Sequence, residues 1–534
     1  MKIRRIVFCF ALILTVTLIG STALTGKTIS KYPGVTVRTL ASGAPLHGHN
    51  GLIFGPDQNL YLASVGGNEI IKMDPHSGRI LDRIGPEHGV SSPDDLTFGP
   101  DGSLYWTAIF AGDVGKLAPD GTHSTLVNLG LGVNPITFSP DNRWLYVARD
   151  FLGKGLYRID PDDGSSTVLL PDIENLNAFD FGPDGRLYGP IYGMEVVVID
   201  VNATPPSVET VLEDIVCSAV KFDSRGRMLT NNGGEVIRYD IRTGKKEVLA
   251  NLPFLVDNIA TDLRDQVYVS GDGIAKILPN RNYIMLSPGG MLGPNGVAVL
   301  PRRDGGESVY VSDIFSLYEF DGRTGTKRSL AAAGVLSGGL TTYLGTLAVD
   351  GDNLIVSSAL TGLIQRWDPL HQEVLNFWYD PNMPQGAMAF GQDIVVTELL
   401  TGQVVRFTPG GRESFAQLAM PVGLATDGTN LWVADYALGQ VFRILPDFQP
   451  VAASLQGPSA LAFYPPDGSL LVIEANPGRL SRIDPATGNV TVLAEGLQAA
   501  YGIPMAYSGV AVGASGAIYV SALVTNELYR IEIH

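Results

Sequence analysis

The chain has 534 residues, more than one hydrophobic core usually supports, so two domains or a repeat array are expected. Its 63 glycines and 34 prolines, with a charged fraction of only 17%, favour short strands and tight turns over long helices or disorder. The 54 acidic residues outnumber the 37 basic ones, and the formal net charge is −17. Such a surface repels phosphate groups, which argues against nucleic acid as a partner.

The first 26 residues have the pattern of a signal peptide. Basic residues at positions 2, 4 and 5 precede an apolar run over residues 6–19, and small residues follow at 21–23. An uncleaved N-terminal anchor is the alternative, although a spanning helix usually needs about 20 apolar residues. Both readings predict an exported protein, periplasmic or extracellular, with membrane contact only if the leader is retained. Cys217 is the one cysteine beyond the leader, so no intramolecular disulfide is expected.

A phrase of the form apolar-x-Phe-Gly-Pro-Asp-Gly-x-Leu-Tyr-Val recurs along the chain, and such self-similarity indicates a repeat architecture. Clear copies read GLIFGPDQNLYL from Gly51, DLTFGPDGSLYW from Asp95 and AFDFGPDGRLYG from Ala178. Twelve copies are present. In the first half they place a phenylalanine at intervals of 44, 40, 43 and 41 residues, at Phe54, Phe98, Phe138, Phe181 and Phe222. Each copy continues into a third strand with an Arg-Ile-Asp type ending and a more variable fourth strand.

Four short antiparallel strands every ~40 residues form the blade of a β-propeller. Because propellers carry four to eight blades, twelve copies predict an all-β fold of two tandem six-bladed propellers, with a five-plus-seven division as the alternative. The strand VTVRTL from Val35 has no copy of its own, and the last copy stops at a third strand. We expect Val35–Leu40 to complete the first propeller, over residues 35–279. The segment from Asn282 would then open the second, over residues 280–534, so that each ring is closed by its N-terminal strand.

The phrases GPDGxLYV and GPNGVAV resemble the six-bladed propellers of the regucalcin, gluconolactonase and strictosidine synthase superfamily. The phrases VVTELLTGQVVRF and WVADYALGQVFRI resemble virginiamycin B lyase and NHL-repeat propellers equally well. The resemblance covers almost all of the chain beyond the leader. It implies a propeller fold and, in regucalcin-like members, one divalent cation above the central channel, held by a Glu, an Asn before Gly and an Asp before Gly. Asn295 matches the Asn element, Asp95 and Asn134 match more weakly, and Val422 stands in the place of the Asp.

The residue before each predicted first strand should face the mouth of the channel. In the first ring this set consists of oxygen donors: Asn50, Asp95, Asn134, Asn177, Ser218 and Asp257. In the second ring most residues of the corresponding set are not carboxylate or amide donors: Asn295, Gly345, Gly386, Val422, Ser459 and Ser508. Ca²⁺ takes six to eight oxygen ligands, so we predict one divalent cation, Ca²⁺ before Mg²⁺ or Zn²⁺. The metal ligands we predict are Asp95, Asn134, Asn177 and Asp257, with Asn295 from the resemblance. Alternatively, these residues only cap strand ends.

Two histidines, His47 and His49, lie beside this ring of donors. In an extended segment residues two apart face the same way, so both could reach the channel mouth. A neutral imidazole near a cation-bound water can act as a general base, although a histidine in a glycine-rich loop is more often simply solvated. We therefore predict His49 and Asp95 as catalytic residues of the first ring.

The second ring carries acids where its second strands end: Asp313, Glu398, Asp435 and Glu474. In lyase-like repeats an acid at this place binds metal or takes part in proton transfer, which makes Glu398 and Glu474 further catalytic candidates. Such an acid can equally accept hydrogen bonds from backbone N–H groups of the turn that follows it.

These features lead to three hypotheses of function. The first is metal-assisted hydrolysis of an ester or lactone of a small molecule, because a bound cation polarises a carbonyl and lowers the pKa of water. The second is a non-catalytic extracytoplasmic module whose propeller faces bind a ligand or a protein. The third is elimination chemistry of the lyase type at the second ring. Fold analogy alone cannot choose between them.

Overall fold

The computed structural model describes residues 29–534, apart from 45, 47, 151, 272, 289, 314–315, 334–344, 360–361, 381 and 499–507. The predicted leader and His47 lie outside the described residues. Strands dominate the rest, and the helical segments are the short 3-10 turns η1 (Pro86–His88) and η2 (Pro279–Arg281). Within this part of the chain, no helix has the length and apolar character needed to cross a membrane.

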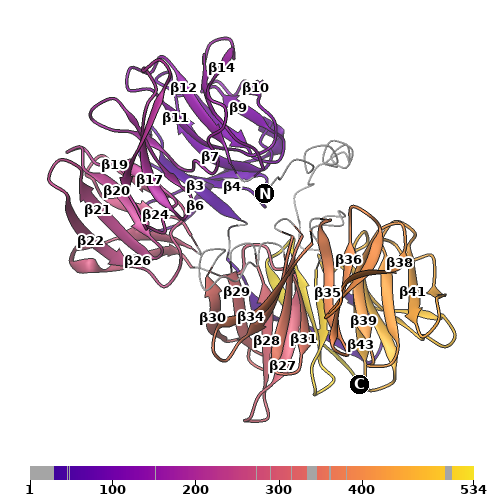
Figure 1. The fold of residues 1–534 in the computed structure, drawn as a ribbon. Coiled ribbons are helices and arrows are strands. Elements are labelled where there is room, and N and C mark those ends of the chain that lie inside the picture. The colour runs from indigo at the N-terminus through magenta and orange to yellow at the C-terminus, as the bar shows by residue number, and fades with distance from the viewer. Residues whose placement is uncertain are drawn as a thin grey trace. The chain divides into compact units, whose positions relative to one another are not determined.

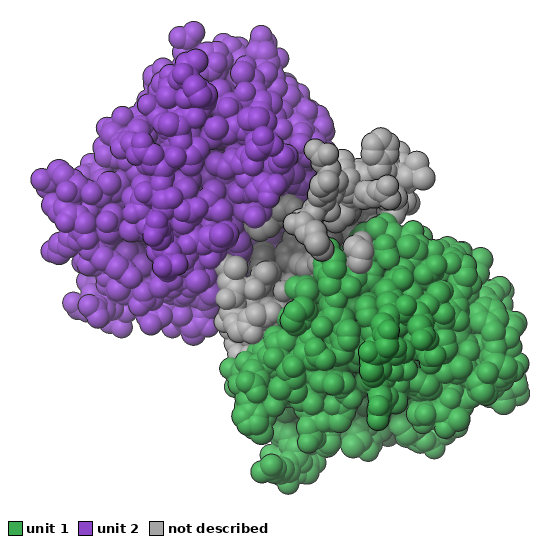
Figure 2. All heavy atoms as spheres, viewed as in Figure 1, with its two compact units in different colours: residues 1–43, 293–534 green, residues 44–292 purple. Residues whose placement is uncertain are grey.

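The first propeller is the compact unit Ala44–Leu292 (Figures 1 and 2). It contains six four-stranded antiparallel sheets, numbered here as blades 1–6 in chain order. Its strands are, in blade 1, β3 (His49–Phe54), β4 (Leu60–Ser64), β5 (Glu69–Met73) and β6 (Ile80–Ile84); in blade 2, β7 (Pro93–Phe98), β8 (Leu104–Ala108), β9 (Asp113–Leu117) and β10 (His123–Asn128); in blade 3, β11 (Val133–Phe138), β12 (Leu145–Arg149), β13 (Leu156–Ile159) and β14 (Ser166–Leu170); in blade 4, β15 (Asp180–Phe181), β16 (Leu187–Ile191), β17 (Glu195–Asp200) and β18 (Ser207–Leu212); in blade 5, β19 (Val220–Phe222), β20 (Met228–Asn232), β21 (Glu235–Asp240) and β22 (Lys245–Asn251); and in blade 6, β23 (Ile259–Thr261), β24 (Val267–Val269), β25 (Ile274–Ile277) and β26 (Tyr283–Ser287).

The second propeller is the other compact unit, Gly293–His534 together with the residues before Ala44. It also has six sheets, blades 7–12. Its strands are, in blade 7, β27 (Val297–Pro301), β28 (Glu307–Ser312), β29 (Ser316–Asp321) and β30 (Lys327–Ala333); in blade 8, β31 (Thr346–Asp350), β32 (Asn353–Ser358), β33 (Leu363–Asp368) and β34 (Glu373–Tyr379); in blade 9, β35 (Pro384–Phe390), β36 (Asp393–Glu398), β37 (Gln403–Thr408) and β38 (Gly411–Gln417); in blade 10, β39 (Pro421–Thr426), β40 (Leu431–Asp435), β41 (Gln440–Leu445) and β42 (Gln449–Ala452); in blade 11, β43 (Pro458–Tyr464), β44 (Ser469–Glu474), β45 (Arg479–Ile483), β46 (Val490–Glu495) and the added β1 (Ser30–Lys31); and in blade 12, β47 (Val510–Val512), β48 (Ile518–Ala522), β49 (Glu527–Ile533) and β2 (Val35–Ser42).

Both rings close through the first strands of their first and last blades. In the first propeller β23 contacts β3, and in the second β47 contacts β27. The prediction of an all-β fold with six four-stranded blades in each ring is therefore confirmed.

The predicted closure of the first ring by Val35–Leu40 is wrong. Strand β2 pairs antiparallel with β49, where Val35 lies opposite Ile533, and so completes the second propeller. Blade 6 takes its fourth strand from β26, which pairs with β25 directly across η2. A local connection of a few residues costs less chain entropy than a distant one, so β26 occupies that edge, while β49 at the chain end leaves an edge for β2. The units accordingly divide at 43/44 and 292/293 rather than at 279/280.

The repeated Phe and Tyr of the sequence phrase form one aromatic ladder in the first propeller. Each Phe packs edge-on against the Tyr of the preceding blade, with ring centroids 5.0–5.3 Å apart. Phe54 of blade 1 meets Tyr268 of blade 6 at 5.0 Å, so the ladder continues across the closure. Such edge-to-face pairs add about 0.5–1.5 kcal/mol each beyond their buried area. The recurring phrase therefore encodes the contacts between blades as well as the turn within each blade.

Candidate functional site

The first strands of blades 1–3 begin with an irregularity that shapes the channel mouth. The register of pairing shifts between His49 and Leu52, between Pro93 and Leu96, and between Val133 and Ile136. A bulge of this kind turns side chains away from simple alternation, and bulges often occur beside functional sites. Here it includes the polar residues Asn50, Asp94, Asp95 and Asn134.

Asp95, predicted as a ligand and as a catalytic residue, is used within the framework. Its Oδ1 accepts the backbone N–H of Leu96 at 2.9 Å, and its Oδ2 accepts that of Ile136 in blade 3 at 3.2 Å. The Asn258 amide of blade 6 lies 3.5 Å from its Oδ1. Burial raises the pKa of Asp95, and Lys221 together with these bonds partly offsets that effect. Asp95 thus ties blades together, and its predicted catalytic and metal roles stay predictions that this bonding does not favour.

Three other carboxyl groups face the axis with unused oxygens: Asp94, Asp150 and Asp257, which we call the axial carboxylate cluster. Asp94 and Asp150 are buried, with 3% and 0% of their surface exposed. Asn50 donates to Asp94 Oδ1 at 3.2 Å, and Asn134 donates to Asp150 Oδ2 at 3.1 Å. Asp94 Oδ2, Asp150 Oδ1 and Asp257 Oδ2 are buried and have no hydrogen-bond partner in the described structure. Unsatisfied buried carboxylate oxygens are costly, so they call for a proton or a cation.

The pKa shifts of these carboxyl groups show that they interact electrostatically with one another or with Asp95. Burial, followed by the charges of Asp150, Asp257 and Asp95, raises the pKa of Asp94 well above its usual range. Burial and the charges of Asp257 and Asp95 do the same for Asp150, against an opposing bond from Asn134. Burial and the charge of Asp95 raise the pKa of Asp257 to about 7. Each group therefore resists ionisation in the absence of a counter-charge.

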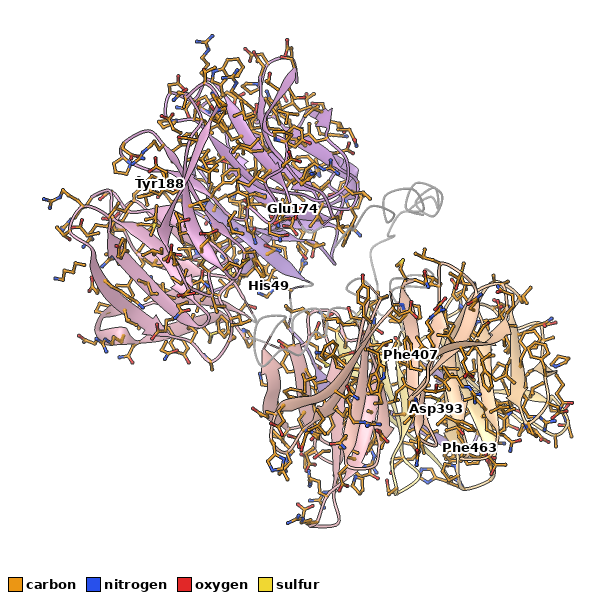
Figure 3. All side chains as sticks on the ribbon, in the orientation of Figure 1. His49, Glu174, Tyr188, Asp393, Phe407 and Phe463 are labelled. Atoms are coloured by element: carbon orange, nitrogen blue, oxygen red, sulfur yellow. The ribbon has the colours of Figure 1, made fainter. Side chains whose placement is uncertain are left out.

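The remaining predicted residues of the first ring take different places. Asn134 lies at the cluster through its bond to Asp150. Asn177 is buried, but its Oδ1 accepts the N–H of Ala178 at 2.8 Å, so it caps its own strand. His49, labelled in Figure 3, is 1% exposed and neither ring nitrogen has a hydrogen-bond partner in the described structure. Burial lowers the pKa of His49 to about 4, against the raising effect of the nearby Gly271 and Gly273 backbone, so the ring is neutral at pH 7.

Asn295, the ligand predicted from the resemblance, belongs to the second propeller, and its role as a ligand stays a prediction. Its backbone carbonyl accepts the N–H of Gly509 at 2.8 Å, which joins blades 7 and 12. Glycines at the starts of the second-ring first strands let these strands approach closely: a Cβ on Gly423 would lie 2.8 Å from the Ser459 carbonyl oxygen. The axial cavity there measures about 60 Å³ and has no acidic residue in its lining. The two rings therefore differ in the chemistry of their axes.

Glu474 and Glu398, the second-ring catalytic candidates, are fully buried and bound by basic side chains. Arg479 donates two bonds of 2.8 Å to Glu474, and the N–H of Gln456 adds a third. These bonds hold the pKa of Glu474 below its usual value, although burial alone would raise it.

Glu398 is held in the same way. Arg412 and Thr401 donate to its carboxylate. Against the raising effect of burial, bonds from Asp380, Thr401 and Arg412 keep the pKa of Glu398 low, while burial and Glu398 raise the pKa of Asp380 to about 7. Asp435 likewise accepts the N–H groups of Ala419 and Met420. In this arrangement the acids stabilise turns and neighbouring side chains, which is the structural role that acids at this place can equally have.

A compact group of possible metal ligands occurs elsewhere. Among the described residues, Asp368, His371 and Glu373 alone bring three carboxylate or imidazole ligand atoms within 4.8 Å of one another. His371 and Glu373 are exposed, and Asp368 accepts two backbone N–H groups of its own turn. The oxygens of Asp94, Asp150 and Asp257 do not all lie within 4.8 Å of one another, so an ion at the axial carboxylate cluster would be reached by some of them through water or would take amide oxygens as ligands, as Ca²⁺ sites commonly do.

Comparison with protein-family models and with curated proteins gave no match. Solved structures do match. A gluconolactonase from Xanthomonas campestris is 14% identical and covers 48% of this chain and 91% of its own, with a TM-score of 0.38. Virginiamycin B lyase from Staphylococcus aureus is 14% identical over 53% of this chain and 96% of its own, with a TM-score of 0.36.

A further match spans nearly the whole chain. The extracellular domain of a protein described as a hybrid two-component system of B. thetaiotaomicron is 11% identical over 93% of this chain and 82% of its own, with a TM-score of 0.35. The chain is a double β-propeller. The twelve antiparallel sheets of the described residues and the contacts that close each ring establish this fold.

Two residues at the centre of the site, Asp94 and Asp150, were not among the predicted ligands. Counting back from the repeated phenylalanine would have found the first: Asp94 precedes Phe98 by four residues, as Asn50 precedes Phe54 and Asp257 precedes Thr261. Asp150 follows β12, the second strand of blade 3, which is the place where the second ring carries Asp313, Glu398, Asp435 and Glu474.

Proposed function

We propose that the first propeller binds one divalent cation at the axial carboxylate cluster and hydrolyses an ester or lactone of a small molecule there. The observation that carries this proposal is that Asp94, Asp150 and Asp257 each have one buried carboxylate oxygen with no partner in the described structure, while the charges of Asp150 and Asp257 act on Asp94. Oxygen donors with several carboxylates suit Ca²⁺ best and Mg²⁺ next, whereas Zn²⁺ prefers nitrogen and sulfur.

The chain's own residues would prepare this site. The Asn50 amide donates a hydrogen bond to one carboxylate oxygen of Asp94, and the Asn134 amide donates one to Asp150. The second oxygen of each carboxylate remains available to a ligand. A bound cation would polarise a substrate carbonyl and lower the pKa of water. His49 is neutral at pH 7, which is the form a general base requires.

The test combines metal content with activity. After chelation and dialysis, the purified protein is titrated with Ca²⁺ and assayed on a panel of lactones and esters, alongside Asp94→Asn and Asp150→Asn. Asp352→Asn, at an exposed turn of the second propeller, is the matched control. We expect one ion per chain and Ca²⁺-dependent hydrolysis, both lost in the two cluster variants and kept in the control. Binding without hydrolysis would reject the enzyme and support a non-catalytic binding module.

We propose further that the protein is exported. Support comes from the basic and apolar pattern of residues 1–26. N-terminal sequencing of protein recovered from the medium or periplasm tests this: a mature start between residues 21 and 29 is expected. A start at Met1 in the membrane fraction would establish an anchor instead.

A further inference from the structure

A groove runs along the outside of the first propeller between blades 3 and 4. Its volume is about 440 Å³, within the range of about 300–1,000 Å³ common for ligand sites. One wall is the end of β14 and the segment after it, and the other is β17 and β18 of blade 4. The lining is mostly aliphatic: Leu170, Pro171, Ile173, Ile191, Val197 and Val208.

The charged residues that line the groove are acidic. Asp172 and Glu195 belong to its lining, and none of the nine lining residues is basic. Lys154 reaches Asp172 from the rim, 2.5 Å away, but both side chains are largely exposed and such a pair is weak. Further exposed acids follow nearby, Glu174 (labelled in Figure 3) after Asp172 and Glu213 after β18. A ligand for this groove should therefore carry positive charge.

The wall of the groove that blade 4 forms has the periodicity of a strand. Glu195 and Val197 are two residues apart on β17, and Val208 and Thr210 are two apart on β18, where Thr210 lies opposite Val197. Side chains two apart in a strand point to one face with a repeat of about 6.6–6.8 Å. Thr210 donates a hydrogen bond of 2.7 Å to Glu195, and Val208 lies two residues before Thr210, so an extended peptide would present one side chain to Glu195 and the next side chain of the same face to Val208.

We propose that this groove docks an extended peptide segment of a partner protein in which basic and aliphatic side chains alternate on one face. Burial of the aliphatic side chain against Val208 would supply affinity, and the acids would select the flanking basic residues. Val208 is suited to this role because 45% of its surface is exposed to solvent. The proposal is independent of the axial cluster.

The experiment uses the full chain and a fluorescein-labelled pentapeptide, Lys-Ser-Leu-Ser-Lys, followed by fluorescence anisotropy at low and physiological salt. Glu-Ser-Leu-Ser-Glu and Lys-Ser-Ser-Ser-Lys are the comparison peptides. Val208→Lys places a positive charge in the groove. Val168→Lys is the matched control, because Val168 is an equally exposed valine (47%) on the outermost strand β14 but does not line the groove. Both changes are at exposed positions, and thermal unfolding verifies that each variant keeps its fold.

We expect the basic peptide to bind the wild-type chain at least about tenfold more tightly than either comparison peptide, and more weakly as salt rises. Val208→Lys should weaken binding by about tenfold or more, and Val168→Lys by less than about twofold. The proposal is overturned if no peptide binds the wild-type chain at millimolar concentration, if the acidic peptide binds equally well, or if both variants behave alike. Retained Ca²⁺ binding in Val208→Lys separates this result from the fate of the axial site.

Discussion

Asn50 donates a hydrogen bond of 3.2 Å from its amide to Oδ1 of Asp94, a residue 44 positions later in the chain. The two residues are equivalent, since each precedes the repeated phenylalanine of its blade by four positions. Successive repeats thus place an amide and a carboxyl group side by side at the axis, with the amide occupying one oxygen and leaving the other free. Repetition in a closed ring converts distant residues into neighbours, and the axial carboxylate cluster follows from that.

The first prediction contrasts the adjacent residues Asp94 and Asp95. Asp94→Asn replaces a buried carboxyl group, whose ionisation burial and neighbouring acids oppose, by a neutral amide, so the calcium-free protein should become more stable by about 1–2 kcal/mol at pH 8. Asp95→Ala leaves the N–H groups of Leu96 and Ile136 without their acceptor, so it should lower stability by about 2–3 kcal/mol. Chemical denaturation of both variants in the presence of chelator measures whether the free energy of unfolding rises or falls relative to the wild type. Loss of stability in both would mean that Asp94 is a structural group like its neighbour.

A second prediction concerns pH. The pKa values of Asp94 and Asp150 are raised, and that of Asp257 is raised to about 7. Between the unfolded value near 4 and about 7, the folded protein therefore binds more protons than the unfolded chain, so stability falls as pH rises through this window. In chelator, the melting temperature should be several degrees lower at pH 8 than at pH 5 because of these groups.

Other carboxyl groups titrate with the opposite sign, so the pH effect is read as a difference. The wild-type chain is compared with the double variant Asp94→Asn, Asp150→Asn, whose melting temperature should fall less between pH 5 and pH 8. Saturating Ca²⁺ should abolish the fall in the wild type, since the ion replaces the protons. Identical pH profiles for the two proteins would contradict this account.

The third prediction assigns Glu474 to structure. Glu474→Ala leaves the Arg479 guanidinium without its main partner, and breaking a buried pair in this way costs about 3–5 kcal/mol. Glu413→Ala, which removes the exposed partner of Arg406 in the same propeller, should cost under about 1 kcal/mol. Hydrolytic activity per folded molecule should be unchanged in both. An activity loss in Glu474→Gln at full stability would instead revive the lyase hypothesis.

How much of this could be predicted from the sequence depends on whether the information is local. The Phe-Gly-Pro-Asp-Gly phrase determines hairpins and the aromatic contacts between blades, so twelve blades in two rings follow from it. The segment Val35–Ser42 lacks the repeated phrase, so its sequence does not tell which propeller it completes. It pairs with the last blade of the second propeller because the corresponding edge in the first propeller is taken by β26, which is nearer in the chain. Asp150 lies outside the repeated phrase, and only the closed ring brings it to Asp94 and Asp257.

A fourth prediction follows from the closing strand. Removal of residues 1–28 should leave both propellers intact, whereas removal of residues 1–42 also deletes the short β1 together with β2 and exposes the edges of β46 and β49. The second propeller should then become sensitive to protease while Ala44–Leu292 persists as a resistant fragment, because its own six blades are complete. Limited proteolysis with mass spectrometry measures this. Equal resistance of the two truncated chains would show that β2 is dispensable.

The most direct measurement of the central claim is calorimetric titration of the chelator-treated full chain with CaCl₂, repeated on Asp150→Asn. We predict one ion bound per wild-type chain, with stabilisation of about 2.7 kcal/mol at a hundredfold excess over the dissociation constant, and no binding to the variant. The absence of binding to the wild-type chain, or undiminished binding to Asp150→Asn, would contradict the account.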